Sequence, residues 1–167
     1  WLPARPFQHV LSCTMPVIER FYNAFAQRDW ATMGACYHAE ARFSDPVFPD
    51  LDSARVKAMW KMLLGGETDL RVEFSVLEES AEAGLVKWDA YYTFSASKRK
   101  VHNIVTSTFT LKDGLIWKQR DTFDLWKWSR QALGTTGVLL GWSPIVRNKV
   151  QGMAAKRLAK AMGDGNL

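Results

Sequence analysis

The hydrophobic pattern of this chain changes its period near residue 70, and this change limits the possible folds more than any other feature. Before it, three segments carry apolar residues three and four positions apart, the spacing of one helix face. After it, four long segments alternate apolar and polar residues, and Lys112-Asp113-Gly114 is the clearest hairpin turn between them. The predicted strands cover residues 70–78, 85–95, 100–111 and 115–124. Helices followed by consecutive antiparallel strands predict an α+β domain, with helices packed on one face of a curved sheet.

Residues at the helix ends organise the N-terminal half of the chain. Thr14 supplies a capping hydroxyl, with Pro16 in the turn that follows. Asp29 and Ser53 can cap a second and a third helix, and Gly65 can end the third. We therefore expect helices from residue 14 to 27 or 28, over 30–37 and over 53–64, and a strand over 40–45.

After residue 125 the chain is apolar and irregular until a final amphipathic helix over 145–162. The inward face of that helix is expected to be Val146, Val150, Met153, Ala154 and Leu158. These boundaries predict an N-terminal arm (1–13), one α+β domain (14–126) and a helical C-terminal extension (127–167).

The composition is that of a packed domain rich in aromatic residues. At 167 residues, of which 47% are hydrophobic and 13% aromatic, the chain can bury a sizeable core and is too apolar to be disordered. Eight Trp and nine Phe suit either a large lined cavity or an extensive subunit interface, and composition does not separate the two.

The formal net charge of +5 does not by itself predict a nucleic-acid groove. The basic residues are scattered, apart from Lys98-Arg99-Lys100 at a turn and a cluster on one face of the last helix. A nucleic-acid groove would interleave them with exposed aromatic residues, so we interpret them as solvated surface and expect no nucleic-acid partner. Docking of the basic helix to a membrane or an acidic partner is the less favoured interpretation, and we expect no membrane partner.

No motif in the sequence predicts a metal or a cofactor. The cysteines, Cys13 and Cys36, lack metal-ligand spacing and are interpreted as reduced thiols of a cytoplasmic protein. The three histidines form no ligand-type cluster, and neither a phosphate-binding glycine loop nor a nucleophile elbow is present in the sequence. Any chemistry is therefore expected to use side chains alone.

Residues 43–50 read FSDPVFPD, which places Asp45 at the end of an apolar strand, directly before a proline. Two interpretations stay open. Asp-Pro is common turn chemistry, so the carboxylate can simply end the strand. A carboxylate at the rim of an apolar pocket formed by Phe43, Phe48 and Trp60 would instead have its pKa raised by desolvation, toward the strength of a general base.

The stretches FYNAFAQRDWATM and FTLKDGLIWKQRDTFDLW, with a strand ending in Asp-Pro between them, resemble the nuclear transport factor 2-like superfamily over about residues 14–126. SnoaL-like, ketosteroid-isomerase-like and limonene-epoxide-hydrolase-like enzymes belong to that superfamily. The resemblance implies a cone-shaped sheet (an α+β barrel), in which N-terminal helices close a deep, often apolar pocket for a small hydrophobic ligand. It also implies a homodimer.

In ketosteroid-isomerase-like enzymes, the residue that matches Asp45 is an aspartate that moves a proton beside a carbonyl. The oxyanion-hole donors of those enzymes, a tyrosine and a protonated aspartic acid, match Phe21 and Ser107. Tyr22 is adjacent to Phe21 but points about 100° away around the helix. The resemblance therefore implies a base at Asp45 and argues against ketosteroid isomerisation itself.

Limonene-epoxide-hydrolase-like enzymes use an Arg-x-Asp on a central strand and an Asp on the last strand. The matching residues are Lys87, Asp89 and Asp121. A lysine at this position lacks the planar fork with which arginine bridges two carboxylates. The Tyr and Asn that hold the water in those enzymes match Phe43 and Asp45, so that part of the site is altered as well.

The strand over 85–95 gives two conflicting predictions for Lys87 and Asp89. Alternation usually turns the apolar set toward the core, whereas the resemblance turns Lys87 and Asp89 into the pocket. Both can hold if a partner subunit or the extension over Trp126–Trp142 covers the outer face, and we favour that interpretation. The apolar set is Trp88, Ala90, Tyr92 and Phe94, and the other set is Lys87, Asp89, Tyr91 and Thr93.

The resulting hypothesis is a cofactor-free enzyme that applies carboxylate acid–base chemistry to a small hydrophobic substrate, by epoxide-hydrolase-like water addition or by isomerase- or dehydratase-like proton transfer. The expected catalytic residues are Asp45 and Asp121, tuned by Asp89 and Lys87. The expected substrate-binding residues are Phe21, Tyr22, Phe43, Trp60, Tyr91, Asn103, Ser107, Trp117, Gln119 and Phe123. The alternative is a ligand-binding or oligomerisation module of the same fold without turnover.

Overall fold

The computed structural model describes residues 15–163, so Thr14 and the predicted arm over 1–13 fall outside it. The helices are α1 (Val17–Ala26), α2 (Trp30–Ala35), α3 (Ser53–Leu64), α4 (Leu125–Leu133), α5 (Thr135–Leu140) and α6 (Pro144–Gly163). The strands are β1 (Tyr37–Ser44), β2 (Leu51–Asp52), β3 (Arg71–Glu79), β4 (Ala83–Phe94), β5 (Arg99–Lys112) and β6 (Leu115–Thr122). The predicted elements are confirmed apart from their exact ends, and the segment predicted to be irregular contains α4 and α5.

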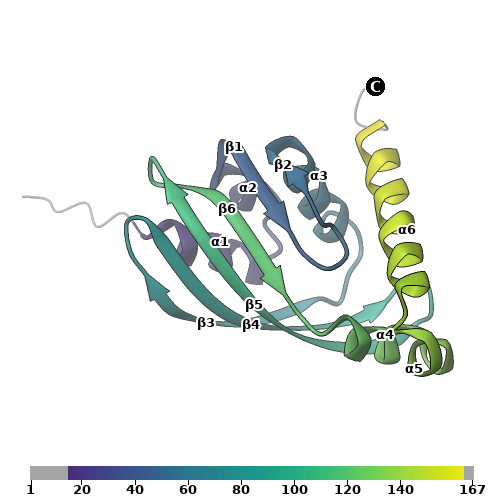
Figure 1. Cartoon of the computed structure of the whole chain (residues 1–167). Coiled ribbons are helices and arrows are strands. Elements are labelled where there is room, and N and C mark those ends of the chain that lie inside the picture. The colour runs from purple at the N-terminus through teal and green to yellow at the C-terminus, as the bar shows by residue number, and fades with distance from the viewer. Residues whose placement is uncertain (1–14, 164–167) are drawn as a thin grey trace, which may run out of the picture.

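All the described strands belong to one sheet in the order β2-β1-β6-β5-β4-β3. Neighbours are antiparallel, except that β1 and β6 run parallel. Helix α1 contacts both β3 and β6, which are separated in the sheet by β4 and β5, so the sheet bends around the helix (Figure 1). The predicted α+β architecture is therefore confirmed: a curved but unclosed sheet with the N-terminal helices on its concave side.

Capping and turn signals are confirmed at most of the predicted positions. The side chain of Asp29 accepts a hydrogen bond at 3.1 Å from a backbone N–H in the first turn of α2. Helix α3 is capped in the same way by Asp52 at 2.9 Å, so the prediction that Ser53 is the cap is wrong by one residue. In the turn from β5 to β6, Asp113 and Gly114 have the positive φ angles, 55° and 72°, that a two-residue hairpin loop requires.

Strand β4 resolves the conflict between its two predicted faces. The apolar set around Trp88 is buried on the concave side of the sheet, against α1. Lys87 is exposed and Asp89 is half-buried on the convex side. The expectation that Lys87 and Asp89 point into the cone is therefore wrong, because burying the aromatic face stabilises the domain more than burying a Lys–Asp pair would.

The C-terminal helices gather at one end of the sheet and do not cover its convex face (Figure 1). Trp128 of α4 donates a hydrogen bond from its indole N–H to the Tyr92 hydroxyl at 2.7 Å, on the concave side. Gln151 of α6 donates to the carbonyl of Pro46 at 3.0 Å, next to Asp45. The extension therefore continues the core at the end where Asp45 lies. The interpretation that it covers the convex face is wrong, whereas cover by a partner subunit stays a prediction.

Helix α6 packs through a narrower face than its sequence predicts. Val146 and Leu158 are buried, but Met153 is 57% exposed, so the prediction that Met153 faces inward is wrong. The reason is that α6 packs mainly against α3, and a single stripe of residues covers that contact.

Gly137 allows α5 to lie directly against α4. A Cβ atom at this position would be 1.9 Å from the carbonyl oxygen of Ser129, a clash that only a shift of backbone can relieve. Gly137→Ala is therefore expected to lower the free energy of unfolding by about 2 to 3 kcal/mol, measured by urea denaturation. Gly152→Ala is the matched control, because nothing lies within 4 Å of its Cβ position. There the better helix propensity of Ala should raise stability by about 0.5 to 1 kcal/mol, and equal effects of the two changes would contradict the packing described.

Candidate functional site

Asp45 begins the loop after β1, and the backbone of that loop fixes its carboxylate. Its Oδ1 atom accepts hydrogen bonds from the backbone N–H groups of Val47 at 2.7 Å and Phe48 at 2.5 Å. Its Oδ2 atom accepts no hydrogen bond from the described residues. Burial raises the pKa of Asp45 from 3.8 to about 6, although the two N–H groups act to lower it. Asp45 is therefore a turn residue whose carboxyl group keeps its proton to a higher pH than an ordinary aspartate does.

Asp121 lies deeper, on β6, and only 4% of it is exposed. Its Oδ1 atom accepts hydrogen bonds from the Ser107 hydroxyl at 2.6 Å and from the Gln119 amide at 3.1 Å. Burial raises the pKa of Asp121 from 3.8 to about 7, and the nearby charge of Asp45 acts in the same direction. Neither carboxylate has an ion-pair partner among residues 15–163. The structure thus brings together the two predicted catalytic aspartates without a compensating cation.

A chain of buried hydrogen bonds holds the Asp121 side of the site. The Trp60 indole N–H donates to the Tyr37 hydroxyl at 2.9 Å, and that hydroxyl donates to Gln119 at 2.5 Å. On the other side, the Trp88 indole N–H donates to the Ser107 hydroxyl at 2.8 Å. Each donor to Asp121 is therefore oriented by a second buried group. Tyr37 and Trp88 were not predicted as site residues, because Tyr37 was expected to end the second helix and alternation marks Trp88 only as core.

Phe21 and Tyr22 both face the interior, although they point in different directions around α1. Both are fully buried, because the bent sheet surrounds the helix on more than one side. The angle between the two side chains therefore does not take Tyr22 out of the interior, and its substrate-binding role stays a prediction. Its hydroxyl accepts or donates no hydrogen bond within the described residues. Burial, followed by the charge of Asp121, raises the pKa of Tyr22 well above 10.0, so the phenol stays protonated beside Asp121.

Phe43, Asn103 and Phe123 also lie on the concave side of the sheet. Phe43 is 1% exposed, and its ring centre is 6.1 Å from that of Trp60. Phe123 is half-buried and contacts both hydrophobic clusters of the domain. Asn103 is half-buried and shares its face with buried Val105. These positions agree with a role in lining a substrate site, which stays a prediction.

Three predicted site residues lie together on the convex face instead. Asp89 Oδ1 is 2.6 Å from His102 Nε2, and the Tyr91 ring stacks on the same imidazole with ring centres 4.3 Å apart. Tyr91 and His102 border an open pocket of about 460 Å³ on this face. Lys87, Asp89 and Tyr91 are therefore separated by the sheet from Asp45 and Asp121.

Trp117 also lies away from the two carboxylates. Its half-buried ring lies under the ammonium groups of Lys112 and Lys118, which are 5.3 Å and 4.3 Å from the ring centre. A register shift between Thr110 and Leu111 interrupts the alternation on which its predicted orientation depended.

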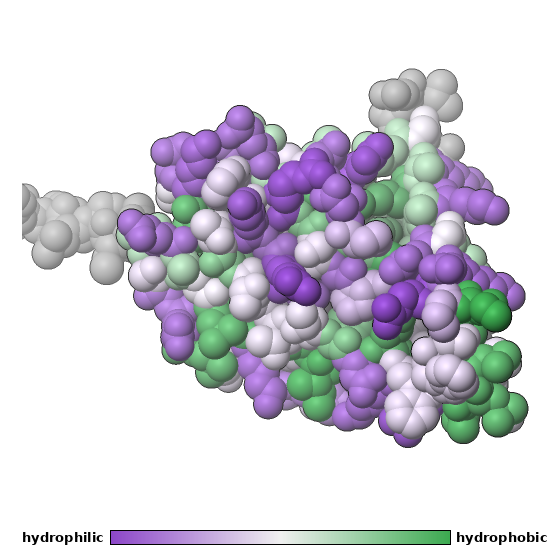
Figure 2. All heavy atoms as spheres, viewed as in Figure 1, coloured by the Kyte–Doolittle hydropathy of each residue, from purple (hydrophilic) through white to green (hydrophobic). Residues whose placement is uncertain are grey.

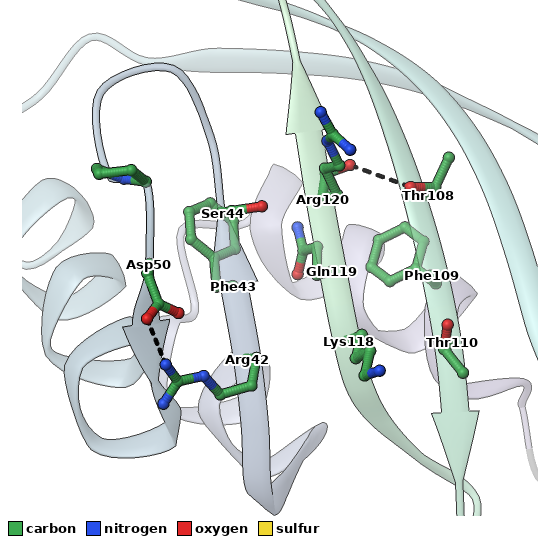
Figure 3. Close-up of a pocket in the computed structure, with 11 residues that line it drawn as sticks. Arg42, Phe43, Ser44, Asp50, Thr108, Phe109, Thr110, Lys118, Gln119 and Arg120 are labelled. Carbon is green, nitrogen blue, oxygen red and sulfur yellow. Dashed lines mark hydrogen bonds and ion pairs between the residues drawn. The ribbon is translucent and has the colours of Figure 1, made fainter.

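A second open pocket, of about 390 Å³, follows the outer surface of β1, β6 and β5 (Figure 3). Its basic lining residues are Arg42, Lys118 and Arg120, and Arg42 forms an ion pair with Asp50 at the rim. The carboxylates of Asp45 and Asp121 are not among its lining residues. The candidate site is therefore the buried carboxylate pair and not either surface pocket.

Residues 15–163 contain no group of three His, Cys, Asp or Glu side chains arranged as a metal site. Cys36 is a buried free thiol. No helix in this part of the chain is long and apolar enough to cross a membrane.

Residues 18–119 match the family model of the SnoaL-like domain. The chain belongs to the SnoaL-like family. The match includes Asp45 and Tyr22 but stops just before Asp121, and it leaves the C-terminal helices of this SnoaL-like protein outside the family model. No curated protein matches the chain.

Solved structures share the fold over most of this SnoaL-like chain. An LEH-like epoxide hydrolase of M. tuberculosis has a TM-score of 0.56 at 20% identity, covering 76% of this chain and 94% of that one. A protein with a ketosteroid isomerase-like fold from Catenulispora acidiphila, in complex with trimethylamine, has a TM-score of 0.59 at 12% identity. The match covers 78% of this chain and 100% of that one. A nuclear transport factor 2-like protein of unknown function from Burkholderia pseudomallei has a TM-score of 0.58 at 16% identity. The match covers 70% of this chain and 94% of that one. At these identities the likeness shows a shared fold and no shared reaction.

Proposed function

We propose that this SnoaL-like protein is a cofactor-free enzyme that transfers a proton on a small hydrophobic substrate, with Asp45 as the base and Asp121 as the acid. The observation that supports it is the pair of carboxylates without cations, whose pKa values are raised by burial to about 6 and about 7. Two neighbouring carboxyl groups with separated pKa values can act in opposite protonation states at the same pH.

The hydrogen bonds support a role for one oxygen atom of each carboxyl group. Both donors to Asp45 use Oδ1, which leaves Oδ2 free to accept a proton from the substrate. Both donors to Asp121 also use Oδ1, which leaves Oδ2 to carry the proton that the acid donates. Because Asp45 is the more exposed of the two, the substrate would approach from the loop after β1.

Isomerase- or dehydratase-like proton transfer fits these residues better than epoxide-hydrolase-like water addition. A protonated Asp121 beside the neutral Tyr22 phenol offers two donors to a developing oxyanion, although the positions matching the isomerases hold Phe21 and Ser107. The set that would match the epoxide hydrolases is split, because Lys87 and Asp89 lie on the convex face. If water addition occurs, it has to use Asp45 and Asp121 alone.

We also propose that the protein is a homodimer in the cytoplasm. The superfamily resemblance supports a homodimer, and the buried free thiol of Cys36 agrees with a reducing, cytoplasmic location.

A hydrogen-exchange assay tests the proposed reaction class. The protein is incubated in D₂O with a panel of small hydrophobic ketones, and incorporation of deuterium beside the carbonyl is followed by NMR. Catalysis is expected to rise with pH through about 6, as Asp45 ionises, and to fall through about 7, as Asp121 loses its proton. A parallel panel of epoxides in oxygen-18 water detects water addition instead. Ligand binding without either reaction would favour the binding-module alternative.

A further inference from the structure

The end of the molecule formed by α5 and the start of α6 exposes an unusual number of large apolar side chains. Five of them lie within eight residues of sequence, and we call them the apolar tip: Val138 (50% exposed), Leu139 (66%), Leu140 (51%), Trp142 (68%) and Ile145 (78%). Figure 2 shows hydrophobic surface gathered at the lower right of the view, over α5. Single exposed apolar residues are ordinary, but a contiguous group of this size marks an interaction surface.

The side chains of the apolar tip point outward because the opposite side of α5 packs against α4. Gly137 and Gly141 are buried, and a Cβ atom on either would lie within 3 Å of neighbouring atoms, so α5 is pressed against α4 through its glycines. The large side chains of α5 can then point only away from the domain. The Trp142 indole N–H donates to the Leu139 carbonyl at 3.1 Å, which fixes the indole on the tip.

The charge around the tip has a single sign. Residues 125–163 contain seven Lys and Arg and no Asp or Glu, whereas the rest of the chain has fifteen Lys and Arg against seventeen Asp and Glu. The net positive charge therefore comes from α4 and α6, which lie on either side of α5 in the sequence. On α6 an exposed stripe with helical spacing continues from the tip: Ile145, Lys149, Met153, Lys156 and Lys160.

We propose that this end of the protein docks on an anionic phospholipid surface. The apolar tip enters the interface between headgroups and acyl chains, and the lysines of α6 contact the anionic headgroups. An exposed tryptophan beside aliphatic residues, flanked by lysines with long apolar stems, suits such an interface. This inference is independent of the proposed reaction. Docking would bring the domain to the lipid bilayer, in which hydrophobic compounds dissolve.

Charge complementarity favours a membrane over a second copy of the chain. Two tips packed together would bring two positively charged C-terminal regions toward each other, and residues 125–163 supply no acidic side chain to separate them. An anionic bilayer offers an apolar interior and a negative surface at the same time. The tip also projects outward, so a protein partner would need a matching apolar groove ringed by acids.

Vesicle co-sedimentation of the full chain tests the proposal. The protein is expected to bind vesicles of phosphatidylcholine with about 30 mol% phosphatidylserine, and to bind pure phosphatidylcholine at least tenfold more weakly. Raising NaCl from about 0.1 M to about 0.5 M should weaken binding several-fold, because it screens the headgroup contacts. Trp142→Ser with Ile145→Ser should reduce binding about tenfold or more, since it removes apolar burial.

Matched variants separate this proposal from its rivals. Leu77→Ser changes a 56% exposed apolar residue on β3 and should leave binding unchanged. Lys149→Glu with Lys156→Glu should abolish the preference for phosphatidylserine while keeping the melting temperature. Equal binding to both vesicles, or no effect of the Trp142 and Ile145 changes, would overturn the proposal. The proposal would also be overturned if the protein self-associated without lipid in sedimentation velocity and the Trp142 and Ile145 changes abolished that self-association. Leu139→Ser, a single change on the same tip, is expected to weaken vesicle binding independently of those two.

Discussion

Asp121→Asn is expected to raise the free energy of unfolding at about pH 8 by about 2 to 4 kcal/mol, although it changes a buried, hydrogen-bonded residue. The folded state holds the pKa of Asp121 at about 7, above the value of 3.8 for a free side chain. As pH rises between these values, the unfolded chain releases the proton first, so the wild-type protein loses stability over this interval. Asparagine has no charge to bury and can accept the same bonds from Ser107 and Gln119.

The stabilisation from Asp121→Asn should therefore depend on pH. Denaturant unfolding should show almost no difference from the wild type at about pH 4 and a full difference above about pH 7. Asp69→Asn is the control of opposite sign, because hydrogen bonds from Thr93 lower the pKa of the exposed Asp69 to about 2. That change should reduce stability above pH 4 and should not raise it at any pH. A loss of stability from Asp121→Asn at alkaline pH would contradict a buried carboxylate without a counter-charge.

Asp45→Asn is expected to lower turnover by about 10³-fold, because it removes the base and keeps the turn. The amide oxygen of asparagine can still accept the N–H groups of Val47 and Phe48, so the loop is retained. At about pH 5, where the carboxyl of Asp45 is itself protonated, stability should change by less than about 1 kcal/mol. The measurement pairs steady-state rates on the substrate found in the exchange panel with thermal melting.

Asp50→Asn is the matched control for Asp45→Asn, because Asp50 lies in the same loop but pairs with Arg42 at the surface. It should leave turnover within about twofold of the wild type, since exposed ion pairs contribute little. If Asp45→Asn retained turnover, the base would have to be another residue. If Asp45→Asn unfolded the protein at about pH 5, Asp45 would have only a structural role. At that pH residue 45 is uncharged both in the folded wild type and in the variant.

The sheet could be predicted from the sequence because every long strand has one buried face, which leaves a period of two. The same alternation correctly placed Trp88 inward, and the family resemblance misplaced Lys87 and Asp89. A match of positions between distant relatives carries no information on which face of a strand remains buried. At 12% to 20% identity, the solved structures show a shared fold and not which side chains lie on which face.

Only part of the candidate site could be predicted. Asp45 and Asp121 follow from the Asp-Pro motif and the superfamily pattern. The orienting roles of Tyr37 and Trp88 do not, because a hydrogen bond between distant side chains leaves no sequence period. Tyr22 was predicted as a binding residue from the superfamily pattern, but its burial together with Phe21 depends on the sheet's curvature, which makes two faces of α1 interior. The exposed apolar tip could not be predicted from the sequence either, since only the packing of Gly137 shows which side of α5 is exposed.

The pKa values of the two aspartates can be measured directly, without knowledge of a substrate. Carbon-13 NMR of the carboxyl groups, with aspartate labelled selectively and assigned through Asp45→Asn and Asp121→Asn, follows each titration in the folded protein. The expected result is two apparent values, about 6 and about 7, of which the upper one falls when the carboxyl of Asp45 is removed. Titration of both groups near the ordinary aspartate value of about 3.9 would contradict the acid–base pair on which the proposed function depends.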